Sequence, residues 1–222
     1  DGEEWNLANN FLNILIAIMA VTAGVIFIFT PWLIGLIAPG FSPEKKELAV
    51  LFTRVMLFSP IIFSISVVIG SILQVFHRFL AYALAPIMYN FGIIFGAIFL
   101  VPKFGPLGLA EGVVLGALLH LLIQLPALRG IGFKWKKVWH WGDAGIGKIL
   151  KLMIPRTVGL AAVQVNWIIL NALATTISAG SVAVLNFANN FQYLPISLVG
   201  ISTAVASFPT LSRQALEEDK TA

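Results

Sequence analysis

The sequence predicts an all-α membrane protein, a polytopic bundle of about six membrane-spanning helices. Of its 222 residues, 59% are hydrophobic and only 11% are charged. Soluble globular chains are typically about 45–50% apolar and about 25% charged. A mean hydropathy of +0.93 therefore indicates a protein whose apolar surface is covered mainly by lipid.

Six apolar stretches are long enough to span a membrane, because a helix needs about 20 residues to cross roughly 30 Å of hydrocarbon. Backbone polar groups cannot stay unpaired in lipid, so these stretches must be helices and not open strands. The predicted spans cover residues 11–38, 48–76, 82–101, 107–125, 152–178 and 182–211.

The connections between these spans carry turn residues. Gly and Pro occur at 39–43 and 102–106, Gly and Ser occur at 178–181, and a shorter link lies at 77–78. Prolines inside three spans predict kinked helices whose freed carbonyls are satisfied by neighbouring groups; these are Pro60, Pro155 and Pro195.

The longest connection, residues 129–151, is the predicted domain boundary. It combines basic residues with tryptophans, a composition typical of a segment at the headgroup surface of a membrane. The basic run is short and sits between two spans, which disfavours a nucleic acid as partner. The residues concerned are Arg129, Lys134, Lys136, Lys137, Lys148, Lys151, Trp135, Trp139 and Trp141.

Loop charge predicts the orientation. The side that holds Arg78, the 129–151 connector and the C-terminal tail carries nine basic residues, and the opposite side carries three. The positive-inside rule places the first side, and both ends of the chain, in the cytoplasm. The acidic residues before the first span are the wrong charge for a signal peptide. We expect both ends to be cuts in a longer protein.

Polar side chains follow one face of each of the last two spans. At 100° per residue they fall within an arc of about 100° on each helix. They could be interhelical hydrogen-bond donors and acceptors, worth about 0.6 kcal/mol each, or the wall of a hydrated cavity, which we favour. The predicted substrate-binding residues are Arg156, Gln164, Asn171, Asn186, Asn189 and Asn190.

Other polar residues within the spans predict no catalytic centre. Arg54 and Glu111 could face the bundle interior or reach the headgroups from near the helix ends. His120 and Gln124 share a helix face, but no second imidazole or carboxylate is near them in sequence, and the chain has no cysteine. We therefore expect no metal, no cofactor and no enzymatic activity.

Four stretches resemble the MurJ/MviN family, the lipid II flippases of the MOP (MATE-like) superfamily. The resemblance implies that the chain is part of a two-lobed MATE-like transporter fold, from about its third to its eighth helix. Residues 1–128 would end the N-terminal lobe, 129–151 would link the lobes, and 152–222 would start the C-terminal lobe. The stretches are TPWLIGLIAPGF (30–41), FHRFLAYALAPIMYN (76–90), GPLGLAEGVVLGALLHLLIQLPAL (105–128) and GSVAVLNFANNFQYLPISLVGISTAVASFPTLSR (180–213).

The implied activity is translocation of a lipid-linked peptidoglycan precursor, carried on undecaprenyl pyrophosphate, across the bacterial cytoplasmic (inner) membrane by alternating access. The implied partners are this substrate, membrane lipids and the remaining helices of the full-length chain. Where the family often has arginine in the sixth span, this chain has Asn190, and an amide can bind phosphate without neutralising it. Arg156 could substitute. A MOP-type exporter of other lipid-linked oligosaccharides or small molecules, or a non-transporting scaffold for envelope synthesis, are the alternatives.

Overall fold

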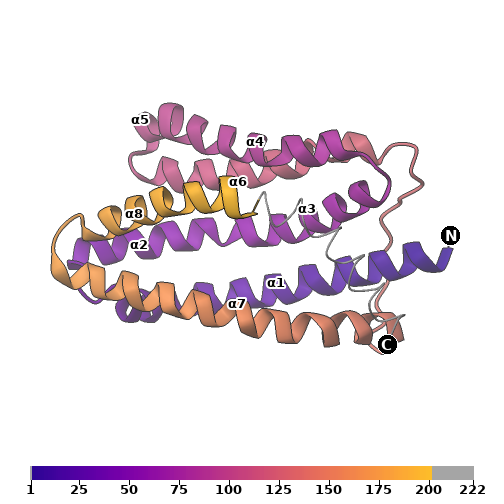
Figure 1. Ribbon diagram of the computed structural model, residues 1–222, viewed down its shortest axis with the longest axis horizontal. Helices are drawn as coiled ribbons and strands as arrows, with labels where there is room; N and C mark the ends of the chain where they lie inside the picture. Colours follow the sequence, from indigo (N-terminus) through magenta and orange to yellow (C-terminus); the bar gives the residue numbers. More distant parts are fainter. Residues whose placement is uncertain (1, 202–222) are drawn as a thin grey trace.

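The computed structural model describes residues 2–201, and every regular element within them is a helix, which confirms the predicted all-α bundle (Figure 1). Short π- or 3-10-helical pieces extend three of the longer helices: η1 (Gly96–Leu100) with α5 (Val101–Phe104), η2 (Leu125–Leu128) and η3 (Ile196–Ile201). The longer helices are α1 (Gly2–Ile37), α2 (Pro43–Met56), α3 (Phe58–Val75), α4 (Phe79–Phe95), α6 (Leu107–Leu122), α7 (Ala144–Ile177) and α8 (Ser181–Pro195).

Within residues 2–201, five helical stretches are long and apolar enough to cross a membrane, and they correspond to the first five predicted spans. The sixth predicted span, 182–211, begins as α8 and η3, and its last ten residues lie outside the described part of the chain. The N-terminus of α1, the α3–α4 link and the start of α7 lie at one end of the bundle, which we call the connector end (Figure 1).

Two helices begin eight or more residues before their predicted spans. α1 begins at Gly2 rather than near Phe11, and α7 begins at Ala144 rather than near Leu152, so the last residues of the 129–151 connector are helical. The carboxylate of Asp143 accepts a hydrogen bond from the backbone N–H of Gly145 at 2.7 Å and caps α7. The hydropathy pattern predicts the residue at which a helix enters the hydrocarbon. These two helices begin before that residue.

Glycines bring α4 and α6 into close contact. A Cβ atom at Gly92 would overlap the backbone of Gly116, and one at Gly96 would overlap Gly112. On α6, Gly108, Gly112 and Gly116 recur every fourth residue and so lie on one face. Small residues at this spacing let two membrane helices approach until their backbones touch, and packing then replaces the hydrophobic effect as the source of stability.

Prolines explain the irregular parts of two spans. The second predicted span is divided at Leu57 into α2 and α3, because Pro60 has no N–H to donate to the carbonyl of Met56. The π-helical turn η1 likewise precedes Pro102. The break before Pro60 agrees with the expectation that this proline bends its span without ending it, whereas Pro102, predicted in the connection after the third span, lies in the helical piece α5.

Arg54 compensates for a third proline. Pro31 inside α1 leaves the carbonyl of Phe27 without its helical donor. Nε of Arg54 donates to that carbonyl at 3.3 Å, and its guanidinium lies 4.8 Å from the centroid of the Phe27 ring. Arg54 therefore binds the backbone and the ring of a neighbouring helix.

Candidate functional site

The best-defined polar site joins the start of α1 to the connector. Asn9, Asn10 and Asn13 lie on one side of α1 at i, i+1 and i+4, and all three side chains are buried. Buried amides must find partners, since an unpaired one costs about 1–3 kcal/mol. Their partners are backbone groups of residues 134–140, in the connector segment that we call the 133–141 segment.

Each asparagine amide binds this segment in a defined way. Asn10 receives the N–H of His140 at 2.9 Å and donates to the carbonyl of the same residue at 2.8 Å. Asn9 receives the N–H of Lys136 at 2.8 Å and donates to the carbonyl of Lys134 at 3.1 Å. These paired bonds resemble those of a neighbouring β-strand, so backbone groups of alternate residues find partners in a segment without helix or sheet partners.

Asn13 completes the cluster. It donates to the carbonyls of Lys136 at 2.9 Å and Val138 at 3.1 Å, and its oxygen accepts the indole N–H of Trp135 at 3.0 Å. The asparagine cluster (Asn9, Asn10 and Asn13) therefore fixes the segment that leads from α6 to α7 against α1.

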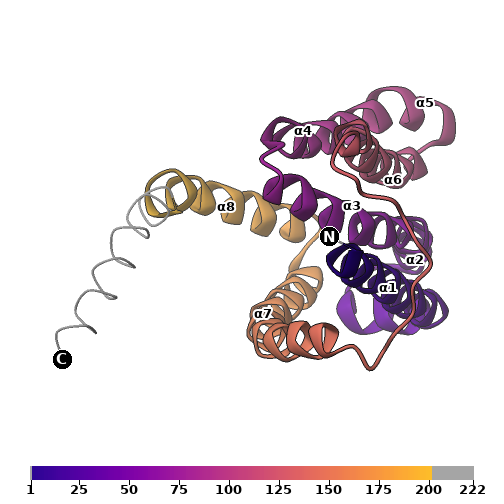
Figure 2. The ribbon, with the colours of Figure 1, turned by 90° about the vertical axis from the view of Figure 1, so that its right-hand side faces the viewer.

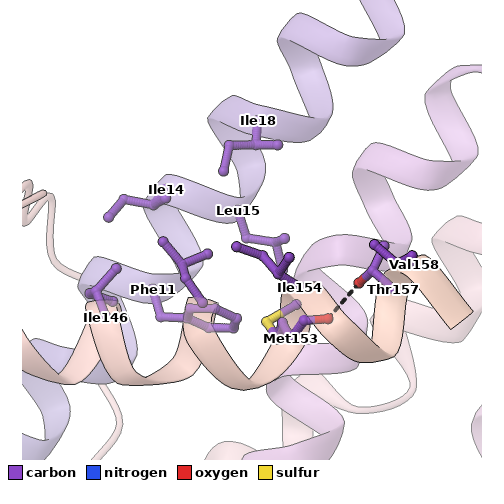
Figure 3. Close-up of a pocket in the computed structure, with 10 residues that line it drawn as sticks. Phe11, Ile14, Leu15, Ile18, Ile146, Met153, Ile154, Thr157 and Val158 are labelled. Carbon is purple, nitrogen blue, oxygen red and sulfur yellow. Dashed lines mark hydrogen bonds between the residues drawn. The ribbon is translucent and has the colours of Figure 1, made fainter.

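Beyond the cluster, α7 packs on α1 through an apolar seam (Figure 3). The seam borders a partly open cavity of about 280 Å³ lined almost entirely by aliphatic side chains and Phe11. The hydroxyl of Thr157 is satisfied within α7, where it donates to the Met153 carbonyl at 2.9 Å. The contacts in this seam are apolar and therefore not directional. The two helices can shift along it without breaking an interhelical hydrogen bond.

A second contact holds the far end of α7. The backbone N–H of Gly40, in the turn after α1, donates to the hydroxyl of Thr175 at 3.2 Å. A Cβ atom at Gly40 would overlap the Thr175 carbonyl, so only glycine permits this approach. α7 is thus fastened to α1 and its following turn near both ends, with an apolar seam between.

A larger groove opens beside the seam at the connector end. It has a volume of about 610 Å³ and lies between α1, α3 and α7. Trp5 of α1 stacks on Phe76 at 5.7 Å between ring centroids and meets Phe133 edge-on at 5.6 Å. The aromatic cluster therefore links α1, the end of α3 and the connector at the groove.

The six predicted substrate residues all lie on α7 and α8, outside the seam and the groove. Arg156, Gln164, Asn186 and Asn190 are exposed, while Asn171 and Asn189 are half-buried. The amides of Asn171 and Asn186 donate to carbonyls of their own helices, at 2.8 Å in each case. The polar faces of α7 and α8 are therefore left largely uncovered by α1–α6. Figure 2 shows α8 projecting away from that bundle.

His120 and Gln124 belong to a buried cluster between α3 and α6. Gln124 Nε2 donates to the His120 carbonyl at 2.9 Å and to Ser66 Oγ at 2.7 Å, and Ser66 Oγ is hydrogen-bonded to His120 Nδ1 at 2.6 Å. Within residues 2–201, no three His, Asp or Glu side chains are grouped as a metal site would require.

The asparagine cluster was not among the predicted functional residues. The signal was present as Asn-Asn-x-x-Asn at 9–13, three carboxamides on one side of a helix that the hydropathy pattern starts at Phe11. Such a pattern indicates a buried polar contact, but it does not say which of the distant loops supplies the partner.

Comparison with known proteins places the whole chain among one group of relatives. A family model described as "Lipid II flippase MurJ" matches residues 2–222. A probable lipid II flippase MurJ of Buchnera aphidicola subsp. Acyrthosiphon pisum is 30% identical over 223 residues, covering 96% of this chain and 43% of that protein. One from Vibrio cholerae is 34% identical over 190 residues, covering 84% of this chain and 35% of that protein.

A solved structure agrees. The structure titled "Lipid II flippase MurJ, inward closed conformation" matches with a TM-score of 0.73 and 25% sequence identity, covering 96% of this chain and 45% of that one. The chain spans less than half the length of these relatives.

Proposed function

The chain belongs to the lipid II flippase MurJ family, and we propose that it supplies the part of a lipid II flippase in which the two lobes meet. It is a multi-pass helical protein of the bacterial inner membrane. The proposed activity is movement of the undecaprenyl-pyrophosphate-linked precursor between leaflets by alternating access, with no chemical step. The observation that carries the proposal is the family match over residues 2–222.

The arrangement of α7 supports a rocking motion. Lobes that rock about a central site need an interface that can change without losing directional bonds, with fixed connections at its ends. The apolar seam between α1 and α7 is an interface that can change without losing directional bonds. The asparagine cluster and the Gly40–Thr175 contact are the fixed connections at its ends. We propose residues 1–128 and 152–222 as parts of the two lobes, and 129–151 as their link.

The uncovered polar faces of α7 and α8 are the proposed substrate wall. Arg156 supplies a positive charge for a pyrophosphate, and Gln164, Asn171, Asn186, Asn189 and Asn190 supply amide donors. Four of these six side chains are exposed, which a surface that meets a large lipid-linked headgroup requires. In the proposed orientation the connector end and both ends of the chain are cytoplasmic, because that side carries most of the loop lysines and arginines.

The substrate wall is tested by substitution in the intact protein. We expect Arg156→Ala combined with Asn190→Ala to weaken binding of purified lipid II by about tenfold or more, because a charge-assisted hydrogen bond is worth about 1.5–3 kcal/mol. The same variant should fail to support growth of cells depleted of their own flippase. Asn166→Ala, off the predicted stripe, is the matched control and should retain both functions. Unchanged binding and growth in the double variant would rule out this wall.

Accessibility separates transport from a scaffold role. The chain has no cysteine, so single cysteines can be placed at positions 164, 171, 186 and 190, with position 166 as the control. A hydrated wall predicts reaction of the four with a membrane-impermeant thiol reagent and little reaction at 166. Protection of all five positions would favour the scaffold.

Asn190 in place of the family's arginine favours a second candidate, an exporter of another lipid-linked oligosaccharide, which would bind that ligand more tightly than lipid II.

A further inference from the structure

The 133–141 segment exposes its lysine and tryptophan side chains while the asparagine cluster binds backbone groups of alternate residues. The asparagine cluster takes up backbone groups of Lys134, Lys136, Val138 and His140. The three lysines at 134, 136 and 137 are exposed. A segment fixed in this way loses little further backbone freedom when its side chains meet a partner.

Three tryptophans on or next to this segment are exposed although they lie outside the membrane-spanning stretches. Trp135, Trp139 and Trp141 are 63%, 42% and 61% exposed, and the last two rings lie 6.4 Å apart between centroids. The indole N–H of Trp135 is already bound by Asn13, so its ring is held in place with its apolar surface outward. Exposed, oriented indoles beside lysines are typical of surfaces at the membrane interface.

The connector that contains the segment carries almost entirely positive charge. Between Arg129 and Lys151 the chain has six lysines and arginines and one acid, Asp143. That carboxylate is occupied as the cap of α7, where it accepts the Gly145 N–H at 2.7 Å. The exposed lysines therefore have no carboxylate in their own segment to pair with, which leaves their charge for an anionic partner.

The depth of the segment fits a lipid headgroup. The connector crosses the bundle at a large angle to the helix axes at the connector end, and it passes along the outside of α1 (Figures 1 and 2). It is bound to Asn9, Asn10 and Asn13, on either side of Phe11, where the apolar run of α1 begins. That level on a membrane helix is the boundary between hydrocarbon and headgroups.

We propose that the 133–141 segment is a docking surface for anionic phospholipid headgroups of the leaflet at the connector end. The lysines bind the phosphates, and the tryptophan rings insert at the headgroup level. The asparagine cluster holds the segment in the plane of the membrane. This proposal does not depend on which substrate the protein transports.

Proteolysis of the intact protein in nanodiscs tests the proposal. Trypsin can cut after Lys134, Lys136 or Lys137, and cutting after Lys103, at the opposite end of the bundle, normalises for effects of the lipid on the protease. We expect normalised cutting of the segment to be about fivefold slower in phosphatidylcholine with 30% phosphatidylglycerol than in phosphatidylcholine alone. Equal rates in the two membranes would overturn the proposal, whether the segment is cut or protected in both.

Variants identify the groups that bind. Replacing Trp135, Trp139 and Trp141 by alanine should abolish the lipid dependence of trypsin cutting, whereas Trp32→Ala, an equally exposed tryptophan in α1 near the opposite end, should preserve it. Replacing Lys134, Lys136 and Lys137 by glutamine should abolish the protection that anionic lipid gives against chymotrypsin at the tryptophans. Lipid dependence that survives both sets of substitutions would assign the protection to another part of the protein and overturn the proposal.

Discussion

The helices α1–α6 and the pair α7–α8 differ in how they are packed. α3 and α6 contribute many buried residues, and α4 and α6 touch through glycine backbones. α8 contributes no buried residue, and α7 is fastened mainly near its two ends. The difference indicates that α1–α6 hold one another together, whereas the fixed points of α7 lie in a connector and a turn.

The largest effect is expected for a large side chain at the α4–α6 contact. Gly92→Leu should destabilise the protein by about 3 kcal/mol or more, because its Cβ alone would overlap the Gly116 backbone. Gly159→Leu in α7 is the matched control, since nothing lies within 4 Å of a Cβ there. Unfolding in sodium dodecyl sulphate measures both. Equal losses would contradict the difference between the two regions.

The asparagine cluster should give the next largest effect. Asn10→Ala leaves the backbone N–H and carbonyl of His140 without their partner, and we expect a loss of about 1–3 kcal/mol. Asn186→Ala on α8 removes an exposed amide that bonds within its own helix, so its effect should stay within about 0.5 kcal/mol. The same unfolding assay compares the two. A small effect of Asn10→Ala would mean that water replaces the amide.

The buried cluster of α3 and α6 should give an effect of about 1–2 kcal/mol. Ser66→Ala leaves His120 Nδ1 without its hydroxyl partner and removes an acceptor of Gln124. Thr157→Val in α7 removes a hydroxyl that bonds only within its helix, and we expect nearly unchanged stability. Thermal unfolding monitored by circular dichroism separates the pair. A larger loss for Thr157→Val would reverse the comparison.

The smallest effect concerns Arg54 and Pro31. Arg54→Ala should cost about 0.5–1.5 kcal/mol, because it leaves the Phe27 carbonyl unpaired. Pro31→Ala supplies an N–H that can bond to that carbonyl within α1, so Arg54→Ala should cost less in the Pro31→Ala background. A double-mutant cycle measures this coupling. Additive effects would show that Arg54 does not compensate for the proline.

Features of the fold that depend on neighbouring residues could be predicted from the sequence. The five described spans and the bend at Pro60 follow from apolar length and proline chemistry, which act over short distances. The extent of α1 did not follow, because its first turns are stabilised by a loop more than 120 residues away. The polar stripes of α7 and α8 remain a predicted site. The asparagine cluster could not be predicted, because its partners in the 133–141 segment are distant in the chain and only the tertiary structure brings them to α1.

The sequence alone determined that this chain crosses a membrane as helices, since lipid leaves a backbone no other way to pair its polar groups. It also determined where the chain turns and which ends of the helices share the basic residues. Only the tertiary structure decided that Gly92 meets Gly116, that Arg54 serves the carbonyl freed by Pro31, and that Asn10 binds His140. Each of these contacts joins residues distant in the chain. Their pairing therefore depends on how the helices pack, which no local pattern specifies.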